Sequence, residues 1–289
     1  MGTSAHFPAP PLKDLKRGPS AYRLTRREEL KVRIIGVICG HLAMLSLMGC
    51  AENKAQDFSP PPGGEQVTVT VKVPQDLVAD TMRVMYRSQK CPIKRSGANW
   101  TSYEEDGYYS IEVVPQRQGQ SDLYVAKLDR NGGGACQWNL SNVTFGVHYE
   151  NTAKFGRDVE YIGGGKVVVV FDRNLPQERT MYGIHDVEGD IHIRQDYFPW
   201  VSEIYLGGRR NVVQLYGGGK LATYRSLDSK FVKFEPVLHK DTVVRTIGVK
   251  TSGQGEKAEN IYPDGTREFS NYDPSLKKLK AISAGKAVH

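Results

Sequence analysis

Cysteine is the residue type with the most specific chemistry in this sequence. The 289 residues contain four Cys: Cys39 and Cys50 lie near the N-terminus, and Cys91 and Cys136 lie in the body of the chain. The two in the body form no C-x-x-C pair and have no His beside them. A zinc site or a catalytic thiol is therefore disfavoured. If the chain is exported to an oxidising compartment, we expect Cys91 and Cys136 to form one disulfide.

A string of histidines and carboxylates is the pattern that comes closest to a metal site. Its members could converge on one face of two paired strands: His185, Asp186, Glu188, Asp190, His192 and Asp196. The segment Val187–Asp190, however, is typical of a hairpin turn, where carboxylates are ordinary surface residues. We therefore expect a solvated hairpin with no metal and no other cofactor, and a metal site is the alternative.

The patterns that would indicate an enzyme are incomplete. Gly163–Lys166 and Gly217–Lys220 lack the spacing of a phosphate-binding loop, and each precedes a strand instead of a helix N-terminus. No G-x-S-x-G elbow occurs in the sequence. The acidic run Glu104–Asp106 precedes a glycine and is typical of a loop. The sequence therefore favours a binding protein over an enzyme.

The stretch Tyr197–Asn211 concentrates aromatic side chains beside two arginines that follow Gly207 and Gly208. Aromatic and Arg side chains are the usual anchors of protein interfaces. We predict that four residues bind a protein partner: Trp200, Tyr205, Arg209 and Arg210. For Trp200 a place in the core is the alternative, because alternate residues of a strand face inward.

The charge of the chain is unevenly distributed. The formal net charge is +7, but residues 50–275 hold 27 basic and 29 acidic residues, a net charge of −2. A body of that charge is a poor surface for neutralising phosphates, so nucleic acid is not an expected partner.

The N-terminal region has the features of an export signal. Lys31 and Arg33 precede the apolar run Ile34–Met48. This run is shorter than the roughly 20 residues that span a bilayer, and its length suits a secretory signal peptide. It ends in Leu47-Met48-Gly49-Cys50, which resembles the lipobox of bacterial lipoproteins. The alternative is a short buried helix that contains a Cys.

The resemblance to lipoproteins implies cleavage before Cys50 and fatty acylation, palmitate included, of its sulfur and its new amino group. Ala51 follows the Cys where Asp would favour the inner membrane, so the implied location is the periplasmic face of the outer membrane. Residues 51–65 are polar and rich in Pro and Gly, which predicts a flexible tether.

Beyond the tether, short runs of alternating apolar residues such as Val67–Val73 are separated by turn signals. This pattern predicts an all-β, mainly antiparallel, two-lobed and sandwich-like body. Asp264-Gly265 predicts a hairpin with a type I′ turn. The expected division is a signal peptide with its extension (1–49), a tether (50–65), a disulfide-containing β-sandwich-like domain (66–154), a second β-rich domain (155–275) and a basic tail (276–289). A single larger sandwich is the alternative.

An anchored β-rich chain with one disulfide and no catalytic motif also resembles the lipoprotein immunity proteins of bacterial competition systems. The features that carry the resemblance are Leu47–Cys50, the pair Cys91 and Cys136, and the region Tyr197–Asn211. The similarity is to proteins that neutralise phospholipase effectors of type VI secretion. It implies direct binding of a toxin in the periplasm. The rival expectation is a structural or assembly lipoprotein of the envelope or of a secretion system.

Overall fold

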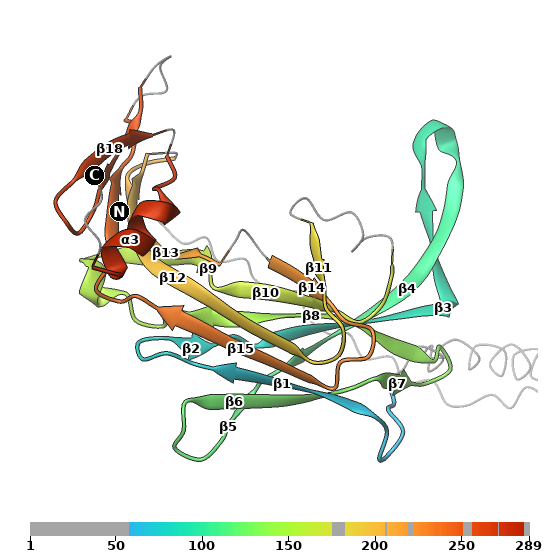
Figure 1. The fold of residues 1–289 in the computed structure, drawn as a ribbon. Coiled ribbons are helices and arrows are strands. Elements are labelled where there is room, and N and C mark those ends of the chain that lie inside the picture. The colour runs from blue at the N-terminus through green and yellow to red at the C-terminus, as the bar shows by residue number, and fades with distance from the viewer. Residues whose placement is uncertain are drawn as a thin grey trace, which may run out of the picture. The chain divides into compact units, whose positions relative to one another are not determined.

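The computed structural model describes residues 58–174, 183–205, 207–218, 222–250, 256–270 and 272–285. All of them belong to one compact unit, Lys54–His289. The expected signal peptide and the expected lipid acceptor Cys50 lie outside the described residues. Within these ranges the chain forms eighteen strands and one α-helix, α3 (Leu276–Ser283) (Figure 1).

The strands form two sheets. The ten-stranded sheet runs β18 (Arg267–Ser270), β17 (Ala258–Ile261), β16 (Val244–Ile247), β12 (Ile191–Ile204), β15 (Phe231–Leu238), β1 (Gln66–Lys72), β6 (Leu123–Asp129) and β5 (Gln116–Arg117), and β13 (Arg210–Gly217) pairs with β12 and with β9 (Val159–Gly164). The eight-stranded sheet runs β11 (Ile184–Asp186), β14 (Ala222–Arg225), β10 (Lys166–Val170), β8 (Trp138–His148), β3 (Met82–Ser96) and β4 (Ser102–Val113), with β2 (Val78–Ala79) and β7 (Asn131–Gly133) on β8.

The two sheets pack face to face through their apolar side chains. In β1 the alternate residues Val67, Val69 and Val71 are fully buried, as the period of two in the sequence requires. Phe145 on β8 meets Phe234 on β15 edge to face, with ring centroids 6.0 Å apart, so the core joins the two sheets. The predicted all-β, sandwich-like fold is confirmed.

The chain passes repeatedly between the sheets. Strands from 66–154 and from 155–275 occur in both of them, and β1 pairs in parallel with β15, more than 150 residues away. Of the sixteen strand pairings in the described residues, ten are antiparallel and six are parallel. The boundary expected near residue 155 therefore does not divide one sheet from the other.

The last part of the expected tether is packed against the body. Phe58 stacks on Tyr109, with centroids 5.6 Å apart, and meets Tyr86 edge to face. The Ser59 N–H donates to the carbonyl of Gly132 at 2.8 Å. A flexible tether over 50–65 is therefore wrong for residues 58–65, because an aromatic side chain finds an aromatic site on the β3–β4 pair.

The start of the expected basic tail is a packed helix. The Ser275 hydroxyl accepts a hydrogen bond from the Lys278 N–H and caps α3. Leu279 is fully buried in a second apolar cluster that contains Phe198 and Trp200. A tail separate from the body is therefore wrong for 276–283, because tertiary packing stabilises a helix too short to be stable alone.

Two predicted turns also differ from the structure. The loop between β17 and β18 has Pro263 at its second position, and only Gly265 has a positive φ, +82°. Because Pro fixes a negative φ, the turn is not type I′. The segment Val187–Asp190 is not a hairpin but a crossover between sheets, since β11 pairs with β14 and β12 lies in the ten-stranded sheet.

Candidate protein-binding surface

The β12–β13 hairpin contains all four residues predicted to bind a partner. Its strands pair from Tyr197 with Gly217 to Ile204 with Arg210. Gly207 and Gly208 have φ values of +73° and +115°, a conformation that other residues rarely adopt, and they turn the chain back. The turn leaves the side chains of Arg209 and Arg210 63% and 53% exposed.

Trp200 lies inside the body instead of on its surface. Its side chain is 4% exposed, and its Nε1–H donates to Thr246 Oγ1 at 2.6 Å. It meets Tyr216 edge to face at 5.1 Å and belongs to the same cluster as Leu279. Trp200 therefore occupies the core position that was given as the alternative. It packs beneath the hairpin and is not part of a binding surface.

Glu203 binds two side chains of the turn, Tyr205 and Arg209. The Tyr205 hydroxyl donates to one of its carboxylate oxygens and Arg209 donates to the other, each at 2.7 Å. These two hydrogen bonds lower the pKa of Glu203 below its ordinary value. Arg210 lies 3.7 Å from Glu160 on β9. The turn is thus a fixed polar surface with two arginines at its rim.

A recess of about 320 Å³ adjoins this turn. The register pairs Val201 with Arg245, Glu203 with Asn211 and Arg245 with Ile261, so these side chains share one face of the sheet. The lining also includes apolar side chains and one further arginine: Phe155, Val159, Ile247 and Arg157. Sequence reasoning missed the recess, because its walls come from five segments that only the pairing of β9, β13, β12, β16 and β17 brings together.

The charges in the recess are unbalanced. Arg157 and Arg245 are exposed, and neither is paired with a carboxylate among the residues that the structure describes. Glu203, the carboxylate of the lining, is already bonded by Tyr205 and Arg209. A guanidinium presents a planar fork that suits a carboxylate. The recess can therefore accept an acidic group that carries apolar surface beside it.

The second conspicuous surface is an arm formed by the far halves of β3 and β4 (Figure 1). β3 pairs with β8 only over Arg83–Arg87 and continues beyond it paired with β4 alone. We call residues 89–106 the arm. Residues 89–92 bulge opposite Asp106, and a Cβ at Gly107 would collide with the Cys91 carbonyl. The run Glu104–Asp106, which was expected to form a loop, lies in β4 because β3 supplies its hydrogen-bonding partner.

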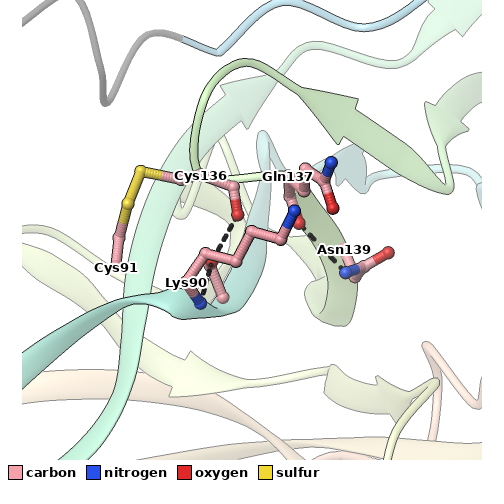
Figure 2. Close-up of a disulfide and its surroundings, with 6 residues drawn as sticks. Lys90, Cys91, Cys136, Gln137 and Asn139 are labelled. Atoms are coloured by element: carbon pink, nitrogen blue, oxygen red, sulfur yellow. Dashed lines mark hydrogen bonds between the residues drawn. A yellow bond between two sulfur atoms is a disulfide. The ribbon is translucent and has the colours of Figure 1, made fainter.

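The predicted disulfide is confirmed and lies at the base of the arm. Cys91 on β3 is joined to Cys136 in the loop between β7 and β8, with 5.4 Å between the Cα atoms (Figure 2). Ser88 Oγ donates to the Cys136 carbonyl, and Asn139 Nδ2 donates to the Gln137 carbonyl at 3.0 Å. Because a two-stranded ribbon is marginally stable by itself, the bridge holds the arm where it leaves the sheet.

The tip of the arm exposes a tryptophan completely. Asn99 and Trp100 have φ values of +58° and +62°, and the Thr101 N–H bonds to the Ala98 carbonyl, as in a type I′ turn. The second central position of that turn prefers Gly, whereas here it holds Trp100, which is 103% exposed. Neither the arm nor Trp100 was predicted, because Asn-Trp is not a turn signal.

The histidine and carboxylate string is dispersed. Asp186 is bonded by Arg225, His192 lies 2.8 Å from Glu235, and Asp196 lies 2.8 Å from His239. Asp190 accepts the backbone N–H groups of Lys230 and Phe231. Among the described residues no group of three His, Cys, Asp or Glu side chains could hold a metal ion.

No described helix is long and apolar enough to cross a membrane. No known protein family, no curated protein and no solved structure matches this chain.

Proposed function

We propose that this chain is a lipid-anchored envelope protein that neutralises a secreted antibacterial toxin, of the phospholipase type, by binding it directly. The observation that supports the proposal most is the recess beside the β12–β13 turn. It combines apolar walls with Arg157 and Arg245, two guanidinium groups that no described carboxylate neutralises. Such a site has the composition of an interface anchor.

The chemistry of the recess defines its partner. A toxin that presents an Asp or Glu beside an apolar side chain fills the recess and pairs with Arg157 or Arg245. Arg209 and Arg210 then contact acidic groups at the rim, where they steer the encounter more than they hold the complex. The body from 50 to 275 carries a net charge of −2, so this cationic site is a local exception.

Protection from an enzyme requires tight binding, because one free toxin molecule acts many times. A dissociation constant of about 1 nM corresponds to about −12 kcal/mol. Few interface residues supply most of such an energy, and they are desolvated at its centre. The recess, and not the exposed rim, is therefore where substitutions should have their largest effect.

The gene neighbourhood supplies the partner for the test. A lipase or other toxin gene beside this one supports the proposal, and a secretion or polysaccharide operon favours an assembly lipoprotein. The dissociation constant for that toxin is then measured with wild type and with Arg157→Glu/Arg245→Glu. We expect a loss of at least about 100-fold, since breaking a buried charge pair costs about 2–5 kcal/mol.

The matched control reverses the same number of charges elsewhere. Lys72 and Lys127 are exposed on β1 and β6, and Lys72→Glu/Lys127→Glu should change the dissociation constant less than about threefold. If both double variants bind equally well, the recess is not the binding site. If the wild type does not bind the toxin, the immunity function itself is wrong.

A further inference from the structure

Trp100 has a left-handed backbone conformation, and its exposed side chain makes no packing contact that would compensate for it. An L-residue in the left-handed region is less stable than in its preferred conformations, because its Cβ crowds the backbone. The side chain is 103% exposed and stacks on no ring of the residues that the structure describes. A local rule broken without structural compensation is characteristic of a functional position. The tip is therefore shaped to present an indole to something outside the body.

The chain outside the described residues leads to the base of the same arm. Phe58, the first described residue, packs on Tyr86 of β3 and on Tyr109 of β4. Cys50 precedes Phe58 by eight residues. Eight residues span at most about 28 Å when fully extended. An acylated Cys50 thus keeps the base of the arm within about 30 Å of the bilayer surface.

The arm is long enough to reach that surface. Along β4, nine residues separate Tyr109, the partner of Tyr86, from Trp100, which is about 30 Å of strand. Residues 89–92 of β3 bulge opposite Asp106 and add no length. This length is about equal to the fully extended span from Cys50 to Phe58, so an arm directed toward the bilayer brings its tip to the headgroups. No rearrangement of the sheets is needed for this contact.

The composition of the tip suits a phospholipid interface. Lys94 and Tyr103 are exposed near the turn, Tyr103 by 53%, whereas Arg95 is bonded to Glu105 of the same arm. Trp and Tyr rings favour the boundary between headgroups and acyl chains. Lys and Arg stems cover apolar surface there while their charges meet lipid phosphates.

We propose that the tip of the arm, centred on Trp100, is a second membrane contact that enters the interface of the bilayer holding the Cys50 lipid. This inference rests on the lipid anchor of the proposed function and not on the toxin. The anchor gives the tip a high effective concentration at the surface, so a weak contact suffices. Its effect is to fix the orientation of the body on the membrane.

The test uses the acylated protein, purified from cells and reconstituted in phosphatidylethanolamine and phosphatidylglycerol vesicles. One set of vesicles carries lipids brominated near the glycerol end of their acyl chains, because bromine quenches nearby indoles. The protein contains three Trp, and the other two, Trp138 and Trp200, are 2% and 4% exposed. Quenching by the brominated lipids therefore reports on Trp100.

We expect brominated vesicles to lower the tryptophan emission of the wild type and to leave that of Trp100→Gly unchanged. Glycine suits the left-handed turn, so this variant retains the arm. Tyr108→Ser, on β4 just outside the arm, is the control and should be quenched like the wild type. If the emission of the wild type is the same in brominated vesicles and in vesicles without bromine, the proposal is overturned. The lipid anchor still stands if mass spectrometry finds the acyl chains on the protein.

Absence of the acyl chains overturns the anchor and this proposal together. Toxin binding is a separate readout. If the wild type shows no lipid quenching and Trp100→Gly weakens toxin binding more than about tenfold, the tip contacts protein and the membrane proposal is wrong.

Discussion

At the scale of single residues, a few side chains fix the conformation of the two surfaces, the arm and the turn beside the recess. Cys91 and Cys136 hold the base of the arm, Trp100 occupies a turn position suited to glycine, and Glu203 fixes Tyr205 and Arg209 beside the recess. The pair of cysteines could be predicted from their number and the export signal. Trp100 could not, because its importance is visible only from its φ angle and its exposure.

The disulfide leads to a prediction about stability. Cys91→Ala should lower the free energy of unfolding by about 4 kcal/mol, since the bridge closes a loop of 45 residues in the unfolded chain. Urea unfolding of the oxidised wild type and of the variant measures the difference. The thiols of the wild type should also resist alkylation in denaturant until a reductant is added, and immediate alkylation would contradict the bridge.

A second residue-scale prediction concerns pH. Lys233 and His192 hydrogen-bond the Glu235 carboxylate at 2.7 and 2.8 Å and lower its pKa from 4.5 to about 2. A depressed pKa stabilises the fold above the ordinary pKa, and this stabilisation is lost as the pH falls toward 2. Glu235→Gln should therefore be less stable than the wild type at pH 7, with a difference that shrinks below about pH 4.5. A difference that stays constant down to pH 2.5 would be evidence against this pairing.

At the scale of elements, the alternation of apolar residues predicted β1 within one residue of its observed bounds. Val67, Val69 and Val71 show why, because they face a single core with period two. Alternation does not reveal the far half of β3, since most residues of the arm are exposed. It also missed the parallel pairs such as β1 with β15, because nothing local encodes a partner so distant in sequence.

Helix α3 illustrates how packing overrides local signals. Its three lysines made the segment resemble a solvated tail, although Leu276, Leu279 and Ile282 recur at a spacing of three. Leu279 contacts the cluster around Phe198 and Trp200, which only the folded chain assembles. The same assembly creates the recess, so neither the helix nor the recess could be derived from a single segment.

The packing of α3 can be tested by truncating one side chain. Leu279→Ala should cost about 2–5 kcal/mol of unfolding free energy, because it opens a cavity beside Trp200. The emission of Trp200 should shift to longer wavelength as water enters. Lys277→Ala, which changes an exposed residue of the same helix, should stay within about 0.5 kcal/mol of the wild type in the same urea titration.

At the scale of the whole molecule, the account separates two surfaces. The arm and the attachment of the chain lie together at Phe58, and Figure 1 shows the β12–β13 turn at the opposite end of the unit Lys54–His289. The proposed toxin is then met in the periplasm by a body of fixed orientation.

Anchoring is the whole-molecule property that can be removed by one substitution. Cys50→Ser should move the protein from the membrane fraction to the soluble fraction and abolish incorporation of labelled palmitate. Urea unfolding of the body should be unchanged, since the described residues begin at Phe58. Unaltered fractionation, with no label in the wild type, would exclude lipidation at this residue.

The central claim is protection by direct binding, and survival measures it most directly. The neighbouring toxin is directed to the periplasm of cells that also express the wild type, Arg157→Glu/Arg245→Glu or Lys72→Glu/Lys127→Glu, each at equal membrane abundance. The account predicts that the wild type and the β1–β6 control restore colony counts and that the recess variant does not. Equal killing with and without the wild-type protein would contradict it.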